Sequence, residues 1–214
     1  MKQTSSNLVF VAILLVGLGA AYVGMPTTES SPENETTLNL IRIGVIISTT
    51  QKYQIYEPFF SEIIVKDVNK YAESVGSPIR FEFLMQDAEG QAAVHLEKMQ
   101  GFLSMDVHLV IGGMWSSQAC ASLSYSNYND MLIVSPSSTS PHLAIPQDNL
   151  FRLVLTDLKY APAMVSILES KEISAVVVIQ RGDSWADGIH HEFQPLFEQG
   201  GGEVIERIRK GEIK

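Results

Sequence analysis

Hydroxyl-bearing residues follow three apolar segments of the chain, and their types and spacing suit the binding of a small polar ligand. They are Ser-Thr-Thr at 48–50, Trp-Ser-Ser at 115–117 and the serine-rich stretch 135–140. A hydroxyl donates and accepts hydrogen bonds, and a helix that begins beside it offers backbone N–H groups that favour a carboxylate or another anion. Serine and threonine are also preferred helix N-caps, so capping alone is the alternative explanation for any one of them.

Alternating strand and helix patterns predict that these three loops lie at one edge of a parallel sheet. The expected strands are 40–47, 79–85, 107–112, 131–135 and 150–155, and the expected helices between them are 57–75, 90–104 and 117–128. Because parallel neighbours need helical crossovers, the predicted fold class is α/β with a doubly wound parallel sheet. Ligands of such sheets bind beyond the carboxyl ends of the strands, where the three loops converge.

A second α/β unit starts near residue 156 and is expected to be incomplete. Its predicted elements are a helix at 157–170, a strand at 173–180, a helix at 184–199 and a strand that begins at 203. Two strands do not make a buried parallel sheet by themselves, so a truncated lobe is expected. The stretch QRGDSWADG at 180–188 follows the first of these strands. There Trp185 either contacts the ligand or packs on the linker, with Asp183 or Ser184 capping the helix.

The composition excludes several functional classes. The chain has 214 residues, a net charge of −9 and no cluster of Lys and Arg, so nucleic acid is not an expected partner. The single cysteine, Cys120, supports neither a disulfide nor a thiolate metal site, and we expect it to be a small buried residue. The sequence holds no glycine-rich nucleotide motif, and the adjacent His190 and His191 point in different directions on a helix. Neither a cofactor nor a metal is therefore expected.

A serine hydrolase on a flavodoxin-like sheet is the enzymatic alternative, with Ser116 as its nucleophile. The segment GGMWSS is not a nucleophile elbow, because two residues separate the glycines from the serine. No base is evident near Ser116, since His95, His108 and His142 stand singly and are expected to be surface or core residues. Asp87 is expected to cap the helix that follows it, and the alternative is a loop acid near the ligand cleft. The chain is thus predicted not to be an enzyme.

The amino-terminal residues predict a location outside the cytoplasm. Residues 8–25 form an uncharged apolar segment, intermediate in length between the core of a signal peptide and a membrane-spanning helix. The small residues 19–21 (Gly-Ala-Ala) offer a cleavage site, so the segment is either cleaved or kept as a membrane anchor. Residues 26–38 are rich in Pro, Ser, Thr and Glu, which predicts a solvated linker, and they carry a glycosylation sequon at Asn34.

The order and spacing of six segments resemble the type 1 periplasmic binding proteins, most closely the branched-chain amino acid binding branch, the substrate-binding component of ABC importers. The segments are IGVIIS, MQDAEG, VIGGMWSSQACA, LIVSPSSTSPHLA, LFRLVLTD and AVVVIQRGDSWADG, and the resemblance covers residues 40–209. It implies a clamp of two lobes that closes on a small ligand, with lobe 1 at 39–155 and a partial lobe 2 at 156–214.

The resemblance also implies which residues bind the ligand. Family members hold the carboxylate and ammonium groups of their ligand with hydroxyl and backbone groups after the third and fourth strands, and an aromatic residue of lobe 2 faces it. In this sequence the implied residues are Trp115, Ser116, Ser117, Ser138, Thr139, Trp185 and Tyr53, with Tyr56 as an alternative to Tyr53. The lobe 2 acid that commonly meets the ammonium group would lie beyond Lys214.

The implied function is extracytoplasmic binding of an amino acid or small amide, with ABC permease subunits as the membrane partners. The alternative among binding proteins is a sensor or receptor module that is anchored through residues 8–25 and uses the same cleft. A structural remnant without a ligand is a further alternative, because lobe 2 is expected to be incomplete.

Overall fold

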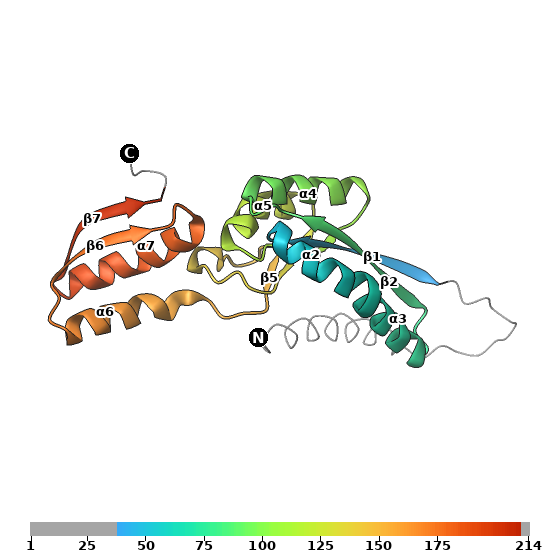
Figure 1. Cartoon of the computed structure of the whole chain (residues 1–214), viewed down its shortest axis with the longest axis horizontal. Coiled ribbons are helices and arrows are strands. Elements are labelled where there is room, and N and C mark those ends of the chain that lie inside the picture. Colours follow the sequence, from blue (N-terminus) through green and yellow to red (C-terminus); the bar gives the residue numbers. More distant parts are fainter. Residues whose placement is uncertain (1–37, 211–214) are drawn as a thin grey trace, which may run out of the picture.

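Two parallel β-sheets organise residues 38–210, the part of the chain that the computed structural model describes (Figure 1). Lobe 1 holds a five-stranded sheet of order β2-β1-β3-β4-β5, and lobe 2 holds a two-stranded sheet, β6-β7. The strands are β1 (Asn39–Ile47), β2 (Ile79–Asp87), β3 (Leu109–Ile111), β4 (Leu132–Ser135), β5 (Leu150–Arg152), β6 (Ala175–Gln180) and β7 (Glu203–Arg209). All neighbouring strands are parallel, which confirms the predicted fold class.

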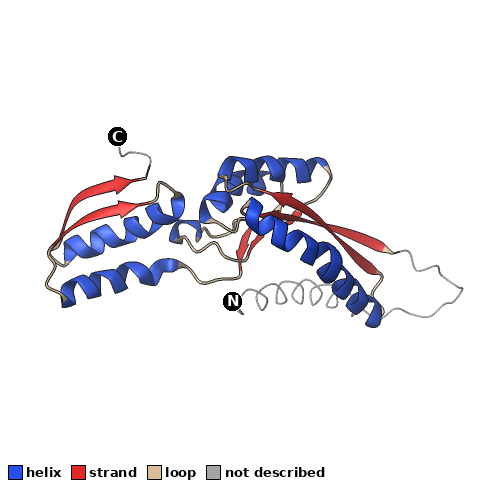
Figure 2. Ribbon diagram, viewed as in Figure 1, coloured by secondary structure: helices blue, strands red, loops and turns tan. Residues whose placement is uncertain are grey.

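Helices cover both faces of the lobe 1 sheet, with α2 and α3 on one face and α4 and α5 on the other (Figure 2). The helices are α2 (Thr50–Phe59), α3 (Val65–Ser74), α4 (Ala92–Ser104), α5 (Ser116–Tyr128), α6 (Tyr160–Ser170) and α7 (Ser184–Gln199). A π-helical turn (Phe60–Ile64) joins α2 to α3, and short 3-10 turns lie at Pro141–Leu143 and Asp157–Lys159. Because the five strands are parallel, the carboxyl ends of β1, β3 and β4, which carry the hydroxyl-rich loops, lie at one edge of this sheet.

The centre of lobe 1 is β1, whose apolar run is explained by burial on both faces. Ile43 packs with Phe60 on one side of the sheet, while Ile46 packs with Met99 and Phe102 on the other. Between them Gly44 leaves room for the Phe102 ring, because a Cβ there would lie 2.5 Å from the ring. The close packing of this ring on the strand fixes α4 against the sheet.

Gly44→Ala is expected to destabilise the chain by about 1–3 kcal/mol, the usual cost of overpacking a core. The added methyl group would overlap the fully buried Phe102 ring. Urea unfolding of the two proteins measures the effect. Gly101→Ala on α4 is the matched control, because nothing lies within 4 Å of its Cβ position and it should be slightly stabilising. Equal stability of Gly44→Ala and the unmodified chain would contradict this packing.

The first helix begins earlier than predicted, at Thr50 rather than at residue 57. Thr49 is its N-cap, since the threonine side chain accepts a hydrogen bond from the backbone N–H of Lys52 at 3.4 Å. The predicted start was wrong, and the helix continues through Pro58. Pro58 has no N–H to donate, and the helix widens into the π-helical turn directly after it. Tyr53 consequently lies on a helix instead of in a loop.

The expectation that Cys120 is buried was also wrong, because its side chain is exposed on α5. The buried residues of α5 are Ser116, Gln118, Ala119, Ser122, Leu123 and Ser126. A helix that buries serine and glutamine gives no apolar periodicity from which its buried face can be predicted.

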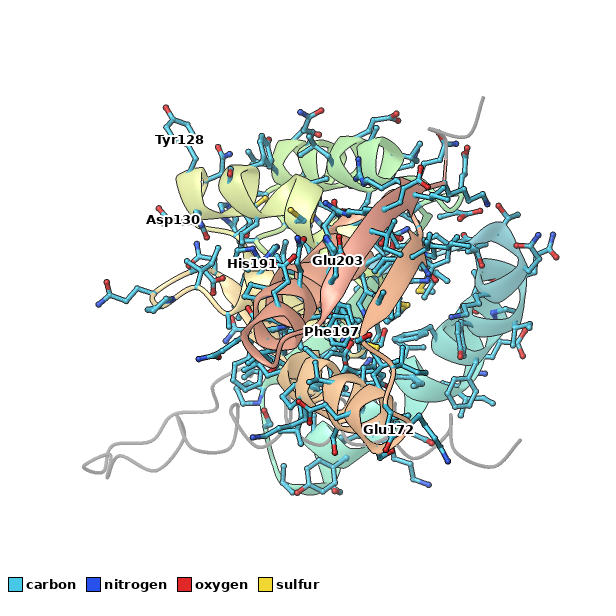
Figure 3. All side chains as sticks on the ribbon, turned by 90° about the vertical axis from the view of Figure 1, so that its left-hand side faces the viewer. Tyr128, Asp130, Glu172, His191, Phe197 and Glu203 are labelled. Carbon is cyan, nitrogen blue, oxygen red and sulfur yellow. The ribbon has the colours of Figure 1, made fainter. Side chains whose placement is uncertain are left out.

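Lobe 2 buries only one face of its two-stranded sheet. Figures 1 and 2 show α6 and α7 on the same side of β6 and β7, and Figure 3 shows Phe197 of α7 beneath the strands. The residues facing the helices pack around Phe193 and Phe197, whereas Val177 is 47% exposed and Ile179 is 75% exposed. The second face of this two-stranded sheet is therefore exposed in the part of the chain that the structure describes.

The predicted apolar segment 8–25, most of the linker and the sequon at Asn34 lie outside the described residues. Within residues 38–210, no helix is long and apolar enough to cross a membrane.

Candidate ligand-binding site

Serine hydroxyls tie the loop after β3 to the loop after β4. The Ser116 hydroxyl oxygen, at the start of α5, accepts hydrogen bonds from the Ser138 hydroxyl and from the Ser140 backbone N–H, both at 3.2 Å. The Ser135 hydroxyl donates to the Gly113 carbonyl oxygen at 2.8 Å. The predicted convergence of these loops is therefore present. Ser116 and Ser138 are nevertheless buried, and their hydroxyls join the two loops to each other.

Helix capping does not explain these serines. The N-cap of α5 is Trp115, so Ser116 is the first helical residue and its hydroxyl bonds to the neighbouring loop. Asp183 does cap α7, since its carboxylate accepts from the Ala186 N–H at 3.0 Å. The prediction that Asp87 caps the next helix was wrong: it accepts from the Glu89 N–H at 2.7 Å and closes the turn before α4.

Thr139 of lobe 1 and Trp185 of lobe 2 meet at the carboxylate of Asp157. The indole N–H of Trp185 donates to Asp157 Oδ2 at 2.7 Å and lies 3.2 Å from Thr139 Oγ1. The Thr139 hydroxyl donates to the same carboxylate oxygen, and the Asp157 backbone N–H donates to the Thr139 carbonyl oxygen at 2.8 Å. Two residues predicted from the sequence are thus brought together by an acid that the sequence analysis did not single out.

The Asp157 carboxylate keeps an unbalanced negative charge. Both side chains that donate to it are neutral, and no ion pair among the described residues includes it. The nearby Arg181 pairs with Asp183, and its guanidinium lies 5.3 Å from the centre of the Trp185 ring. A half-buried carboxylate without a cationic partner is a suitable acceptor for an ammonium group.

Trp115 and Tyr53 border the carboxyl end of β1. The Trp115 ring lies 3.9 Å from the Cβ position of Gly90 and is 36% exposed, so it covers the turn that follows β2. Tyr53 is half-buried on α2, and this burial, with smaller contributions from Glu57 and Asp87, raises the pKa of its hydroxyl.

Ser117 and Tyr56 are the two remaining residues that the resemblance implies for the site. Ser117 is half-buried in the first turn of α5, and Tyr56 is half-buried on α2. Tyr56 packs beside Tyr53 against the same buried cluster of lobe 1.

The two lobes are in direct contact beside this site. The Ser140 hydroxyl donates to the Ser184 carbonyl oxygen at 3.1 Å, and a Cβ on Gly188 would lie 2.6 Å from Ser140 Oγ. The rings of His142 and His191 meet edge to face across the same junction, with their centres 5.0 Å apart. Helix α7 therefore lies close to the loop that carries Ser138 and Thr139.

Two cavities border lobe 2. One of about 630 Å³ lies beside α7 and β7 and includes His142 and Arg207, and one of about 600 Å³ lies along α6, β6 and α7 and reaches Trp185. Ser116 and Ser138 line neither cavity.

Comparison with known proteins identifies relatives over most of the chain. Residues 62–209 match the family described as "Receptor family ligand binding region". An uncharacterized protein of Methanocaldococcus jannaschii is 25% identical over 206 residues, which are 92% of this chain and 49% of that protein.

Solved structures share the fold at low sequence identity. The branched-chain amino acid binding protein LivJ of Streptococcus pneumoniae, in complex with isoleucine, is 20% identical with a TM-score of 0.59 and covers 80% of this chain and 49% of its own. The leucine-binding protein LivK of Thermotoga maritima is 18% identical with a TM-score of 0.60 and covers 81% and 50%. An ABC transporter substrate-binding protein of Desulfitobacterium hafniense, in complex with Leu, is 19% identical with a TM-score of 0.54 and covers 80% and 51%. The chain thus spans about half the length of the relatives that it matches.

Proposed function

The chain belongs to the family of receptor ligand-binding regions, and from this premise we propose that it binds an amino acid of the branched-chain type, or a small amide, between its two lobes. The ligand would be held by hydroxyl and N–H groups of lobe 1 and by the aromatic side chain of Trp185 in lobe 2. Closure of the lobes about the segment near residue 156, where lobe 1 joins lobe 2, would then exclude water from the ligand.

The observation that carries this proposal is the meeting of Thr139, Asp157 and Trp185. Thr139 belongs to lobe 1, and Asp157 and Trp185 belong to lobe 2. Together they supply donors and one unbalanced negative charge. Asp157 suits the ammonium group of an amino acid or the N–H groups of an amide. The start of α5, with the half-buried Ser117, suits a carboxylate, because the N-terminus of a helix carries partial positive charge.

We further propose that the chain works outside the cytoplasm and delivers its ligand to ABC permease subunits. The matched proteins of Streptococcus pneumoniae and Desulfitobacterium hafniense are transporter substrate-binding proteins in complex with isoleucine and leucine, respectively. The apolar segment 8–25 supports export or anchoring of the chain. A membrane-anchored sensor would use the same ligand site, and co-purification with a permease from native membranes distinguishes the two roles.

We propose that the site binds without catalysis. The Ser116 hydroxyl oxygen accepts hydrogen bonds from two neutral donors, and neither a histidine nor a carboxylate hydrogen-bonds to Ser116 within the described part of the chain. Turnover of p-nitrophenyl acetate should be no faster than in buffer and unchanged in Ser116→Ala. Saturable turnover that Ser116→Ala abolishes would favour the hydrolase instead.

A thermal-shift panel of L-leucine, L-isoleucine, L-valine, their amides and acetamide tests the proposal. At a concentration one hundred times its Kd, a ligand stabilises the folded chain by about 2.7 kcal/mol and should raise the Tm by roughly 5–10 °C. N-acetyl-L-leucine, which lacks the ammonium group, is the control and should give no shift. A panel in which no compound raises the Tm would contradict the proposal.

A further inference from the structure

His95 is fully buried on α4, and its two ring nitrogens make different hydrogen bonds. The backbone N–H of Gly113 donates to Nε2 at 2.7 Å, and Nδ1 lies 2.7 Å from the Ser122 hydroxyl oxygen. An imidazole nitrogen that accepts a hydrogen bond carries no proton. The ring is therefore neutral, with its proton on Nδ1, where it can be donated to Ser122.

Gly113, which donates to His95, is the first residue of the Gly113–Ser116 loop, and this loop carries two of the candidate site residues. Gly113 adopts the left-handed conformation, with φ of +59°, and its carbonyl oxygen accepts the hydrogen bond from Ser135 that ties this loop to the next. Trp115 and Ser116 follow within three residues. The position of these two residues thus depends on the bond from Gly113 N–H to the imidazole.

The loop has little space to adjust if that bond is lost. A Cβ on Gly112 would lie 3.0 Å from His95 Nε2, and a Cβ on Gly113 would lie 2.9 Å from the Ala119 side chain. A proton added to Nε2 would point at the Gly113 N–H, so that two donors face each other. Such a ring and the present loop conformation are incompatible.

No charged neighbour among the described residues stabilises the protonated His95 ring. Within the part of the chain that the structure describes, the ring contacts Gly112 and Gly113 at the end of β3 and Ser122 on α5, and none of these residues titrates. Burial alone lowers the pKa of His95, to about 4, with no contribution from a charged neighbour. The ring consequently stays neutral until the solution is strongly acidic.

We propose that neutral His95 is the positioning residue of the Gly113–Ser116 loop and that its protonation releases this loop from the ligand site. The proposal depends on the function proposed above only in its consequence, which is that acid weakens ligand binding. The release of the loop is a property of the chain without ligand and can be measured separately.

Trp115 reports the position of this loop. The sequence contains two tryptophans, so the full chain with Trp185→Phe leaves Trp115 as the only indole fluorophore. Its emission is recorded from pH 7 to pH 3.5 beside the far-ultraviolet circular dichroism. We expect a step in emission with a midpoint near pH 4 that precedes any loss of secondary structure.

His95→Gln is the decisive variant, because the glutamine oxygen can accept from Gly113 N–H but takes up no proton. In this variant the step should disappear. Any change caused by the nearby acids Asp87 and Glu89 should remain in both proteins. A step of the same size and midpoint in His95→Gln would overturn the proposal.

The imidazole ¹⁵N shifts of the unmodified chain provide a test that needs no variant and holds even where His95→Gln does not fold. They should show the neutral ring with its proton on Nδ1 between pH 7 and pH 5, and a proton on Nε2 would overturn the proposal. L-leucine affinity at pH 7 and pH 4 completes the experiment. A chain that fails to bind leucine but shows the step refutes the proposed ligand, whereas a chain that binds leucine without the step refutes the role of His95.

Discussion

Asp157→Asn is expected to lower the affinity for L-leucine about 100-fold, which corresponds to about 2.7 kcal/mol. The carboxylate now accepts from Trp185 and Thr139 and retains a negative charge that no cation balances among the described residues. Asparagine keeps the shape but removes the charge. Its amide N–H₂ group is a donor, like the Thr139 hydroxyl and the Trp185 indole N–H that already face this position. The ammonium group of the ligand therefore loses its acceptor.

Asp130→Asn is the matched control for this substitution. Asp130 is exposed at the end of α5, as Figure 3 shows, and its φ of +50° suits asparagine at least as well as aspartate. Calorimetric titration of L-leucine into the three proteins measures the affinities. Asp130→Asn should match the unmodified chain. Binding by Asp157→Asn that is also unchanged would show that the ammonium group is recognised elsewhere.

His95→Gln is expected to remove a pH-dependent part of the stability worth about 3 kcal/mol, since one pKa unit corresponds to about 1.4 kcal/mol. Burial lowers the pKa of His95 from 6.5 to about 4 in the folded chain, so the unfolded chain binds the proton more readily. The contribution of neutral His95 is therefore complete above pH 6.5 and declines as the pH falls toward 4. Gln does not titrate and has no such decline.

Urea unfolding of the unmodified chain and of His95→Gln at pH 7, 6, 5 and 4.5 measures this difference. The free energy of unfolding of the unmodified chain should fall more steeply with decreasing pH, and the two curves should approach each other in acid. Parallel curves throughout this range would show that His95 is not neutral and buried at pH 7.

The strands of lobe 1 could be predicted because buried parallel strands are continuous apolar runs. The expected strand 40–47 agrees with β1 to within one residue. The expected helix 117–128 also agrees with α5 to within one residue, although its buried serines hid which face is buried. The start of the first helix was missed, since α2 begins at Thr50 and continues through Pro58. Ile179 of β6 is exposed because α6 and α7 pack on the opposite face of the β6-β7 sheet, and the residues of β6 alone do not indicate this.

The convergence of the loops after β3 and β4 at one edge of the sheet was predictable, whereas the contacts of single residues were less so. Hydroxyl-rich loops after β3 and β4 indicated where Ser116, Ser138 and Thr139 would lie, and Trp185 was placed opposite them by the resemblance. Asp157 was missed because its partners Thr139 and Trp185 are 18 and 28 residues away in the sequence. His95 was expected only as a surface or core residue, since nothing in its local sequence indicates the bond to Gly113.

The central claim is that the chain recognises the ammonium group of a small ligand at the junction of its lobes. Calorimetric titration of the full chain with L-leucine and, separately, with N-acetyl-L-leucine tests it most directly, because the two compounds differ in that group. We predict saturable binding of one molecule of L-leucine per chain and no measurable binding of the acetylated compound. Equal binding of both compounds would contradict recognition of the ammonium group, and binding of neither compound, together with none of the amides, would contradict the whole account.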